Sequence, residues 1–308
     1  MKVIYRSGTQ LPKLSKTCVA IGIFDGMHRG HKYLLRRMLV KAKALKATPV
    51  VITFFPHPAH VLRPDLKLGY LVSFEQRLAL MAELGVKVCV VIRFNKTFAK
   101  IAPETFIRDS LVKRLDARAI FVGEDFKFGR DRMGDVHLFK RLAKECGYQM
   151  YAVPALKSGN EPISSTRIRQ SVAEGNLSGV ARLLGRPFSL QGKVVKGKGR
   201  GKGLGFPTAN VRYTSDILPP HGVYAVRVIY KNKIYKGAAN LGLRPSFKEK
   251  NTKPTLEVHI LGLNHSLYSQ TLEVQFLKKI REERKFSSPT ALTAQIRKDI
   301  ARVRKAHG

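Results

Sequence analysis

Residues 197–210, with the sequence GKGRGKGLGFPTAN, have the composition of a loop that binds phosphate, and we call them the glycine loop. Five glycines let backbone N–H groups approach an anion closely, and three cationic residues among them supply positive charge. Thr208 and Asn210 carry oxygen atoms of the kind that Mg²⁺ prefers. The spacing matches neither common phosphate loop, so a nucleotide site here would need a different architecture. A flexible basic surface loop is the alternative.

His28 and His31 form a second candidate site near the N-terminus. They follow residues 17–24, an apolar run without polar alternation that is typical of a buried parallel strand. Helical spacing of apolar residues begins at His31. Ligands of open α/β sheets bind at the carboxyl ends of strands, and helix N-termini favour anions. The histidines therefore have the position of phosphate ligands, although either one alone could be a surface or core histidine.

Residues 163–169, ISSTRIR, form a third candidate site, in which three hydroxyl residues precede a helical pattern with two arginines. Hydroxyls cap helix N-termini, whereas arginines there suit a bound anion better than they suit the helix dipole. A phosphate ligand and a solvated, capped helix explain this segment equally well.

The elements that must position these residues alternate between strand and helix through the first half of the chain, which predicts a doubly wound parallel α/β sheet. Predicted strands cover residues 50–54, 86–92, 119–122 and 149–153 after the first strand, and predicted helices follow residue 31, Ser73, Pro103 and Val136.

The second half of the chain has a different pattern of apolar and turn-forming residues. Gly185 suits a helix C-cap and Pro187 prevents the helix from continuing, so we expect one domain over residues 1–186 and another over 187–308. Short β-rich runs separated by turn signals predict a small barrel, followed by a helix over residues 291–305. The runs cover residues 190–195, 222–230, 234–240, 255–261 and 272–277.

The composition limits the class of protein. The chain has 308 residues and a 44% hydrophobic content, enough for two cores, without an apolar run long enough to span a membrane or a signal-peptide core at the start. Cys18, Cys89 and Cys146 are widely spaced, and no Cys/His cluster has zinc spacing. We therefore expect a cytoplasmic protein with reduced, mostly buried thiols and no membrane partner.

The formal net charge of +36 is extreme and is typical of proteins that bind nucleic acid or anionic membranes. However, the lysines and arginines are scattered from end to end, without an RNA-binding aromatic signature or a zinc finger. We therefore do not expect nucleic acid to be the primary ligand, and phosphorylated small molecules fit the same charge. The sequence indicates neither the oligomeric state nor the reason for the charge.

Several motifs in this order resemble those of bacterial bifunctional riboflavin kinase/FAD synthetases. GIFDGMHRGH resembles the H-x-G-H signature of nucleotidyltransferases, and TFFPHP, FVGEDFKFGRDRMGD and SSTRIR resemble the FMN adenylyltransferase module. The second half resembles the riboflavin kinase module, a small antiparallel barrel, in which the glycine loop matches the ATP-binding flap and Mg²⁺-binding turn. The resemblance extends nearly from end to end.

For the first module, the resemblance implies attack of the FMN phosphate on the α-phosphorus of ATP, which forms FAD and releases pyrophosphate. Such a reaction depends on alignment and charge neutralisation, and the resemblance implies that His28 and His31 bind the ATP phosphates. The other residues implied are Gly22, Phe24, Asp25 and Gly30 at the ATP turn, Ser164, Ser165, Thr166 and Arg169 at the leaving phosphates, and His57, Asp125 and Phe126 beside the nucleotide or flavin.

For the second module, the resemblance implies phosphoryl transfer from ATP to the riboflavin 5′-hydroxyl. It implies Glu257 as general base, Thr208 and Asn210 as Mg²⁺ ligands, and Arg281 as a contact to flavin or phosphate. An outward-facing strand residue is the alternative for Glu257. The residues implied for ATP are Gly197, Gly199, Arg200, Gly201 and Pro207.

The sequence departs from the family pattern at Leu243, Gly262, His265, Ser266 and Ser269, which leaves the efficiency of the kinase open. We expect a two-domain enzyme that converts riboflavin to FMN and then to FAD with two ATP. Activity of only one module is an alternative. A basic regulatory protein that binds flavin or RNA on the same scaffold is another.

Overall fold

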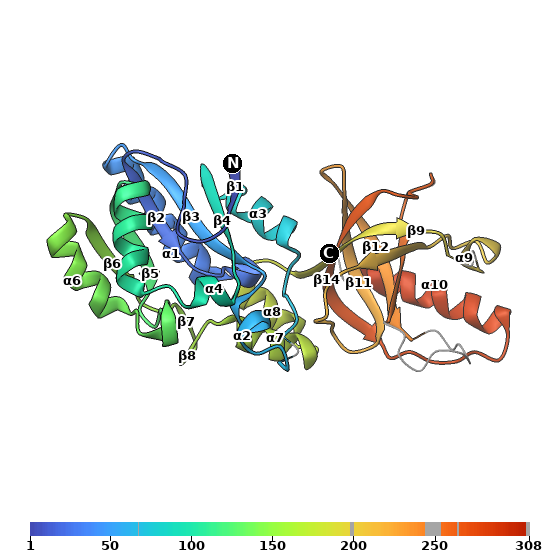
Figure 1. Ribbon diagram of the computed structural model, residues 1–308. Coiled ribbons are helices and arrows are strands. Elements are labelled where there is room, and N and C mark those ends of the chain that lie inside the picture. The colour runs from blue at the N-terminus through green and yellow to red at the C-terminus, as the bar shows by residue number, and fades with distance from the viewer. Residues whose placement is uncertain (67, 198–199, 244–253, 264, 306–308) are drawn as a thin grey trace. The chain divides into compact units, whose positions relative to one another are not determined.

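The computed structural model describes residues 1–66, 68–197, 200–243, 254–263 and 265–305 (Figure 1). The chain divides into two compact units. Met1–Gly69 and Phe74–Ser164 form the first, which we call the sheet unit, and Tyr70–Ser73 and Ser165–Gly308 form the second, the barrel unit. The domain boundary expected between residues 186 and 187 falls after the first two helices of the barrel unit, and it remains a prediction.

The sheet unit contains a parallel sheet with the strand order β1-β4-β3-β2-β5-β6, which confirms the predicted doubly wound α/β class. The strands are β1 (Lys2–Arg6), β2 (Thr17–Ile21), β3 (Thr48–Phe55), β4 (Val88–Arg93), β5 (Ala117–Gly123) and β6 (Gln149–Val153). The helices are α1 (Arg29–Ala44), α2 (Pro58–Leu62), α3 (Phe74–Glu83), α4 (Lys96–Ala99), α5 (Pro103–Thr105), the π-helix η2 (Phe106–Arg114) and α6 (Val136–Cys146), with short 3-10 turns η1 (Asp25–Met27) and η3 (Arg130–Arg132) and a small hairpin of β7 (Lys157–Ser158) and β8 (Glu161–Pro162).

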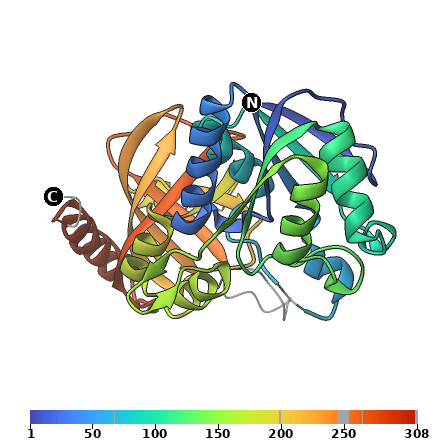
Figure 2. The ribbon, with the colours of Figure 1, turned by 90° about the vertical axis from the view of Figure 1, so that its left-hand side faces the viewer.

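Alternate residues of the central strands pack on opposite faces of this sheet. Val19 and Ile21 belong to a core cluster shared with η2 and α6, whereas Cys18 and Ala20 belong to a cluster shared with α1 and α3. Figure 2 shows α1, in blue, and α6, in green, on either side of the strands. Because both faces are covered, the strands are apolar without alternation, as the sequence of β2 predicted.

The strand order reverses beside β2. The chain passes from β2 to β3 on one side, whereas β5, which follows β4, lies on the other side. In open α/β sheets, the crevice at such a switch point is where ligands bind. The turn that follows β2 is therefore at the expected position for a ligand site.

A buried ion pair holds this turn. Arg77 of α3 is fully buried, and its Nη1 donates a hydrogen bond to the carbonyl oxygen of Ile23 at 3.0 Å. Its Nη2 lies 3.8 Å from Oδ1 of Asp25, which is 1% exposed. The hydroxyl of Thr53 donates to the same carbonyl at 3.0 Å. Because charges buried without a partner are costly, Arg77 fixes α3 and the turn together.

The barrel unit contains a closed antiparallel barrel with the order β10-β13-β12-β11-β14-β9, which confirms the second predicted fold. The strands are β9 (Phe188–Val195), β10 (Ala209–Tyr213), β11 (Gly222–Tyr230), β12 (Lys233–Gly242), β13 (Thr255–Ile260) and β14 (Thr271–Arg281). The helices are α7 (Ser165–Ala173), α8 (Leu177–Leu184), α9 (Arg200–Gly203) and α10 (Pro289–Lys305). Helix α10 packs against β11, β12 and β14, and α8 packs against β9 and β14.

The predicted burial of the cysteines is confirmed for two of the three. All three lie among the described residues and are free, with Cys18 and Cys89 buried and Cys146 half-buried. Burial raises the pKa of Cys18 to about 11 and that of Cys89 to about 12. Among the described helices, none combines the length and the apolar character that crossing a bilayer requires.

The buried pair gives a stability prediction. Arg77→Met should lower the free energy of unfolding by about 3–5 kcal/mol, because the Asp25 carboxylate would lose its buried partner. Urea denaturation of the full chain measures this loss, and adding Asp25→Asn should recover part of it. The control is Arg108→Met, which breaks an exposed pair with Glu145 and should cost less than about 1 kcal/mol. Equal losses in the two variants would contradict the assigned role of Arg77.

Candidate active sites

Three neighbouring strands of the sheet unit bring predicted site residues to one edge. His28 and His31 follow β2, His57 follows β3, and Asp125 with Phe126 follows β5. Since β3, β2 and β5 are adjacent and parallel, these segments leave the same end of the sheet. The structure therefore places together residues that lie far apart in the sequence.

The two histidines are stacked at the N-terminus of α1. Their ring centroids are 3.5 Å apart, and the planes differ by 21°. His28 is the N-cap residue, and its Nδ1 accepts a hydrogen bond from the backbone N–H of His31 at 3.3 Å. Its proton is therefore on Nε2, which can donate to a ligand. The Phe24 ring packs edge-on against His31, with a distance of 5.3 Å between the ring centroids.

His31 is neutral at pH 7. Burial lowers its pKa well below the ordinary value of 6.5, and the nearby His28 and Arg77 lower it further. Its Nδ1 is enclosed and has no hydrogen-bond partner in the described part of the chain. An enclosed ring nitrogen without a partner is typical of a group that meets a ligand.

The glycines of this turn are required by close packing. A Cβ on Gly22 would lie 3.0 Å from the Phe24 ring, and a Cβ on Gly30 would lie 3.1 Å from the His28 ring. Phe24 itself has a φ of 55°, in the left-handed region. The predicted role of these residues in shaping the turn thus has a steric basis.

The segment that leads to Ser164 passes beside this turn, because a Cβ on Gly30 would lie 3.8 Å from the carbonyl oxygen of Ile163. Ser164 ends the sheet unit, whereas Ser165, Thr166 and Arg169 open the barrel unit on α7.

The other predicted residues of the sheet unit differ in exposure. Asp125 is exposed, and Phe126 stacks on Phe128 with a centroid distance of 5.5 Å. His57 caps α2, and its Nδ1 accepts a hydrogen bond from the N–H of Ala59 at 3.0 Å.

In the barrel unit, Glu257 lines a cavity of about 350 Å³ between the barrel and α10, which we call the barrel cavity. Leu256 and Val258 point into the barrel core, so Glu257 lies on the outer face of β13, and α10 residues cover that face. Its register partners are Asn210 on β10 and Asn240 on β12. The carboxylate is thus half-buried between two amide residues, which distinguishes it from an ordinary outward-facing glutamate.

Arg281 lines the barrel cavity too, but its guanidinium is bound within the protein. Its Nε and Nη2 each donate to Oδ2 of Asp299 at 2.9 Å, and Nη1 donates to the carbonyl of Glu282 at 2.9 Å. Asp299 of α10 also accepts from Gln295 at 2.7 Å. Arg281 therefore ties α10 to β14, and its predicted contact with flavin remains a prediction.

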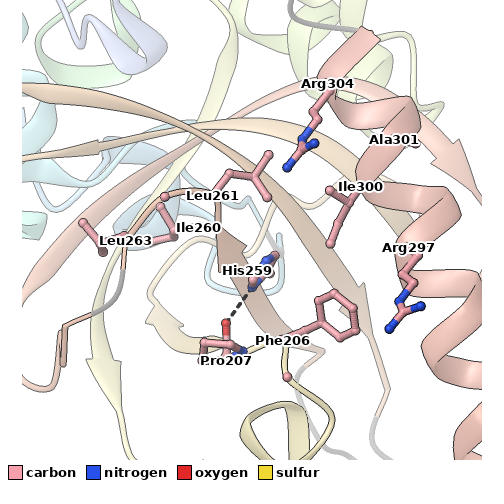
Figure 3. Close-up of a pocket in the computed structure, with 12 residues that line it drawn as sticks. Phe206, Pro207, His259, Ile260, Leu261, Leu263, Arg297, Ile300, Ala301 and Arg304 are labelled. Carbon is pink, nitrogen blue, oxygen red and sulfur yellow. Dashed lines mark hydrogen bonds between the residues drawn. The ribbon is translucent and has the colours of Figure 1, made fainter.

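A second cavity, of about 470 Å³, lies beside the end of the glycine loop, and we call it the loop cavity (Figure 3). The ring nitrogen Nδ1 of His259 donates to the carbonyl of Pro207 at 2.8 Å, and Phe206 contacts the same ring edge-on. Arg297 and Arg304 of α10 line the cavity as well. The sequence reasoning missed His259, although its position two residues after Glu257 places it on the same face of β13.

Packing explains two glycines of the glycine loop. A Cβ on Gly197 would collide with the Asn210 side chain, and one on Gly201 would collide with the carbonyl oxygen of Phe206. Arg200 begins α9, whereas Gly199 lies outside the described residues.

A metal ion at the glycine loop would rely on hydroxyl and amide oxygens. The described residues contain no group of three or more His, Cys, Asp or Glu side chains that could hold a metal ion. Thr208 and Glu257 both line the barrel cavity, and Asn210 is the register partner of Glu257. These are the hard oxygen donors that Mg²⁺ accepts.

The departures from the family pattern fall on exposed turns. Gly262 and Ser269 have φ values of 76° and 63°, and Leu243 is exposed. Ser269 is a residue with a Cβ in the left-handed region, a conformation that costs about 1–2 kcal/mol. His265 and Ser266 line a neighbouring cavity with Tyr268.

Known proteins match both units. A family model described as FAD synthetase matches residues 11–167, and one described as riboflavin kinase matches residues 184–307. The bifunctional riboflavin kinase/FMN adenylyltransferase of Escherichia coli K12 is 38% identical over 293 residues, which cover 94% of this chain and 93% of that protein. The Bacillus subtilis 168 protein of the same name is 35% identical over 289 residues, which cover 92% and 90%.

A solved structure is similar over almost its full length. The crystal structure described as a macrolide-efflux protein from Streptococcus pneumoniae is 30% identical, has a TM-score of 0.87 and covers 99% of each chain. The two family matches fall on the unit with the stacked histidines and on the unit with Glu257, which confirms the resemblance seen in the motifs. The chain belongs to the family of bifunctional riboflavin kinase/FMN adenylyltransferases.

Proposed function

We propose that this chain phosphorylates riboflavin to FMN in the barrel unit and adenylylates FMN to FAD in the sheet unit. The observation that carries the proposal is the presence of two different sites, one built on the half-buried Glu257 and the other on the stack of His28 with the neutral His31. Incubation of the purified protein with riboflavin and Mg-ATP, followed by chromatography of the flavins, tests it. FMN without FAD would leave only the kinase, and absence of FMN here together with absence of FAD in an incubation supplied with FMN would reject both activities.

In the kinase reaction, the 5′-oxygen of riboflavin attacks the γ-phosphorus of ATP, the bond to the β–γ bridging oxygen breaks, and ADP leaves. The hydroxyl is a poor nucleophile, so a carboxylate must accept its proton. Glu257 is suited to this role, since it faces the barrel cavity and Asn210 and Asn240 flank it on the neighbouring strands.

We place the flavin in the barrel cavity and the nucleotide along the glycine loop. Phe206, His259 and Ile300 line both the barrel cavity and the loop cavity, so the two substrates would lie next to each other there. The backbone N–H groups around Gly197 and Gly201 would hold the phosphates, and Pro207 would pack beside them. Thr208 and Asn210 would hold Mg²⁺, which supplies charge neutralisation of the ATP phosphates when bound.

In the adenylyltransferase reaction, a phosphate oxygen of FMN attacks the α-phosphorus of ATP, and pyrophosphate leaves. The phosphate is already ionised, so this site needs hydrogen-bond donors more than a base. Nε2 of His28 and the enclosed Nδ1 of His31 are suitable donors to the α-phosphate. The hydroxyls at residues 164–166 and Arg169 would hold the pyrophosphate.

Glu257→Gln should lower the rate of FMN formation by about 10²–10⁴-fold, because the amide cannot accept the ribityl proton. The conversion of added FMN to FAD should stay near the wild-type rate. Glu273→Gln is the matched control, since Glu273 is a half-buried strand residue of the same barrel outside the cavity. Loss of both reactions in a folded Glu257 variant would contradict independent sites.

His31→Ala should have the opposite effect and lower FAD formation from FMN by on the order of 100-fold, because a donor to the α-phosphate is lost. Riboflavin phosphorylation should not change. His137→Ala, at an exposed position of α6, serves as the control. A wild-type rate of adenylylation in His31→Ala would remove the histidine from the mechanism.

The lowered pKa of His31 predicts a dependence of stability on pH. The unfolded chain has the ordinary His pKa of 6.5, whereas the folded pKa lies well below it, so the unfolded state binds more protons in that interval. Above pH 6.5, His31 is neutral in both states and does not reduce the free energy of unfolding. As the pH falls from 6.5 toward the folded pKa, the free energy of unfolding decreases by at most about 1.4 kcal/mol per pH unit. His31→Gln should flatten this slope in urea denaturation, whereas the exposed-site variant His137→Gln should leave it unchanged.

A further inference from the structure

The loop cavity contains two cationic side chains that have no part in the reactions proposed above. Arg297 and Arg304 line it from α10, whereas Phe206 and Pro207 line it from the end of the glycine loop. Figure 3 shows Arg304 extending from α10 toward Leu261, with Arg297 lower on the same helix. All of these residues belong to the barrel unit, so the arrangement can be described within one compact unit.

One face of α10 forms this side of the loop cavity. Its four lining residues have the spacing i, i+3, i+4 and i+7 of a single helix face, and they are Arg297, Ile300, Ala301 and Arg304. The two arginines are two helical turns apart, about 10 Å along the axis, and the small Ala301 side chain leaves room between them. This spacing suits an extended anion with several charged groups better than a single small ion.

Both guanidinium groups are available to a ligand. The two side chains are exposed, and neither forms a hydrogen bond or an ion pair with a described residue. The described residues that line the loop cavity include no carboxylate, and Asp299, the one acidic residue of α10, is bound to Arg281. Because a planar guanidinium can donate two parallel hydrogen bonds to a phosphate, Arg297 and Arg304 together form a phosphate-binding surface.

The His259 ring cannot replace the arginines as a donor. Its Nδ1 donates to the carbonyl oxygen of Pro207 at 2.8 Å, so the other nitrogen of the neutral ring is an acceptor. An acceptor repels a phosphate oxygen, although it suits a ribose hydroxyl or an adenine amino group. Among the described side chains that line the loop cavity, Arg297 and Arg304 are therefore the donors for an anion.

We propose that Arg297 and Arg304 bind the phosphates of the ATP that the barrel unit uses and thereby set its affinity. This assignment rests on the proposed kinase function, in which the nucleotide lies along the glycine loop. Phe206 and Pro207 lead directly to Thr208, one of the two proposed Mg²⁺ ligands, so phosphates held there lie on the side of the loop that faces α10. Contacts made in the bound substrate as well as in the transition state lower the KM for ATP and leave kcat almost unchanged.

Steady-state kinetics of the full-length protein test the proposal. The double variant Arg297→Gln/Arg304→Gln should raise the KM for ATP in riboflavin phosphorylation by on the order of tenfold, because two charge-assisted contacts are lost. The kcat at saturating ATP should stay within about twofold of the wild-type value. The KM for ATP in the conversion of FMN to FAD should not change, because that reaction belongs to the sheet unit.

The matched control is Lys298→Gln/Arg302→Gln, which removes the same charge from exposed positions of the same helix outside the cavity. Its KM for ATP should equal that of the wild type. Arg297→Lys/Arg304→Lys keeps the charge without the planar guanidinium and should recover part of the affinity. An unchanged KM in Arg297→Gln/Arg304→Gln, an equal rise in the control, or a loss of kcat alone would overturn the proposal.

Calorimetric titration with Mg-ADP separates this inference from the proposed function, because it needs no turnover. The wild type should bind ADP at a site that weakens in Arg297→Gln/Arg304→Gln and not in the control, whereas adenosine, which has no phosphate, should bind both variants equally. Normal FMN formation with unaltered ADP binding would reject the role of the arginines alone. Absence of FMN formation by the wild type, together with ADP binding that depends on Arg297 and Arg304, would reject the proposed kinase and leave the nucleotide site.

Discussion

The buried pair of Arg77 and Asp25 is the constraint on which the sheet unit depends. The pair joins α3 to the turn after β2. The same turn contains Phe24, whose ring packs against Gly22 and makes an edge contact with His31. A buried carboxylate cannot lose its partner without a large cost, so the pair resists displacement of the turn from α3. The positive charge of Arg77 also contributes to the low pKa of His31. One ion pair therefore holds the turn in place and adds to the effect of burial and of His28 on the pKa of His31.

In the barrel unit, too, an ion pair holds a helix in place. Asp299 binds Arg281 and accepts from Gln295, and Arg281 and Arg284 lie over the Phe286 ring at 5.6 Å and 4.8 Å. This network fixes α10 along one wall of the barrel cavity. In both units, a charged side chain bound within the protein holds a helix against the element that carries candidate site residues.

The sequence predicted the elements with strong apolar patterns and missed those without them. The helix at Val136–Cys146 and the strands at Gln149–Val153 and Gly222–Tyr230 begin and end where the patterns predicted. Strand β1 was missed because KVIYR is an edge strand with exposed ends, and β10 because it begins inside the motif that was taken for a turn. Periodicity does not distinguish the wider turn of η2 from an ordinary helix. Arg77 and His259 act through contacts between distant segments, which one-dimensional patterns do not contain.

The side chains of Phe206, His259 and Ile300 form a layer that lines both the barrel cavity and the loop cavity. A bulkier or smaller residue in that layer changes the volume on both sides at once. With the flavin and the nucleotide placed as proposed, substitutions that adapt the barrel cavity to a different flavin analogue would also change nucleotide affinity, and compensating changes would have to arise in pairs. Shared partitions of this kind restrict the evolutionary paths open to an enzyme, because each step must be tolerated by two ligands.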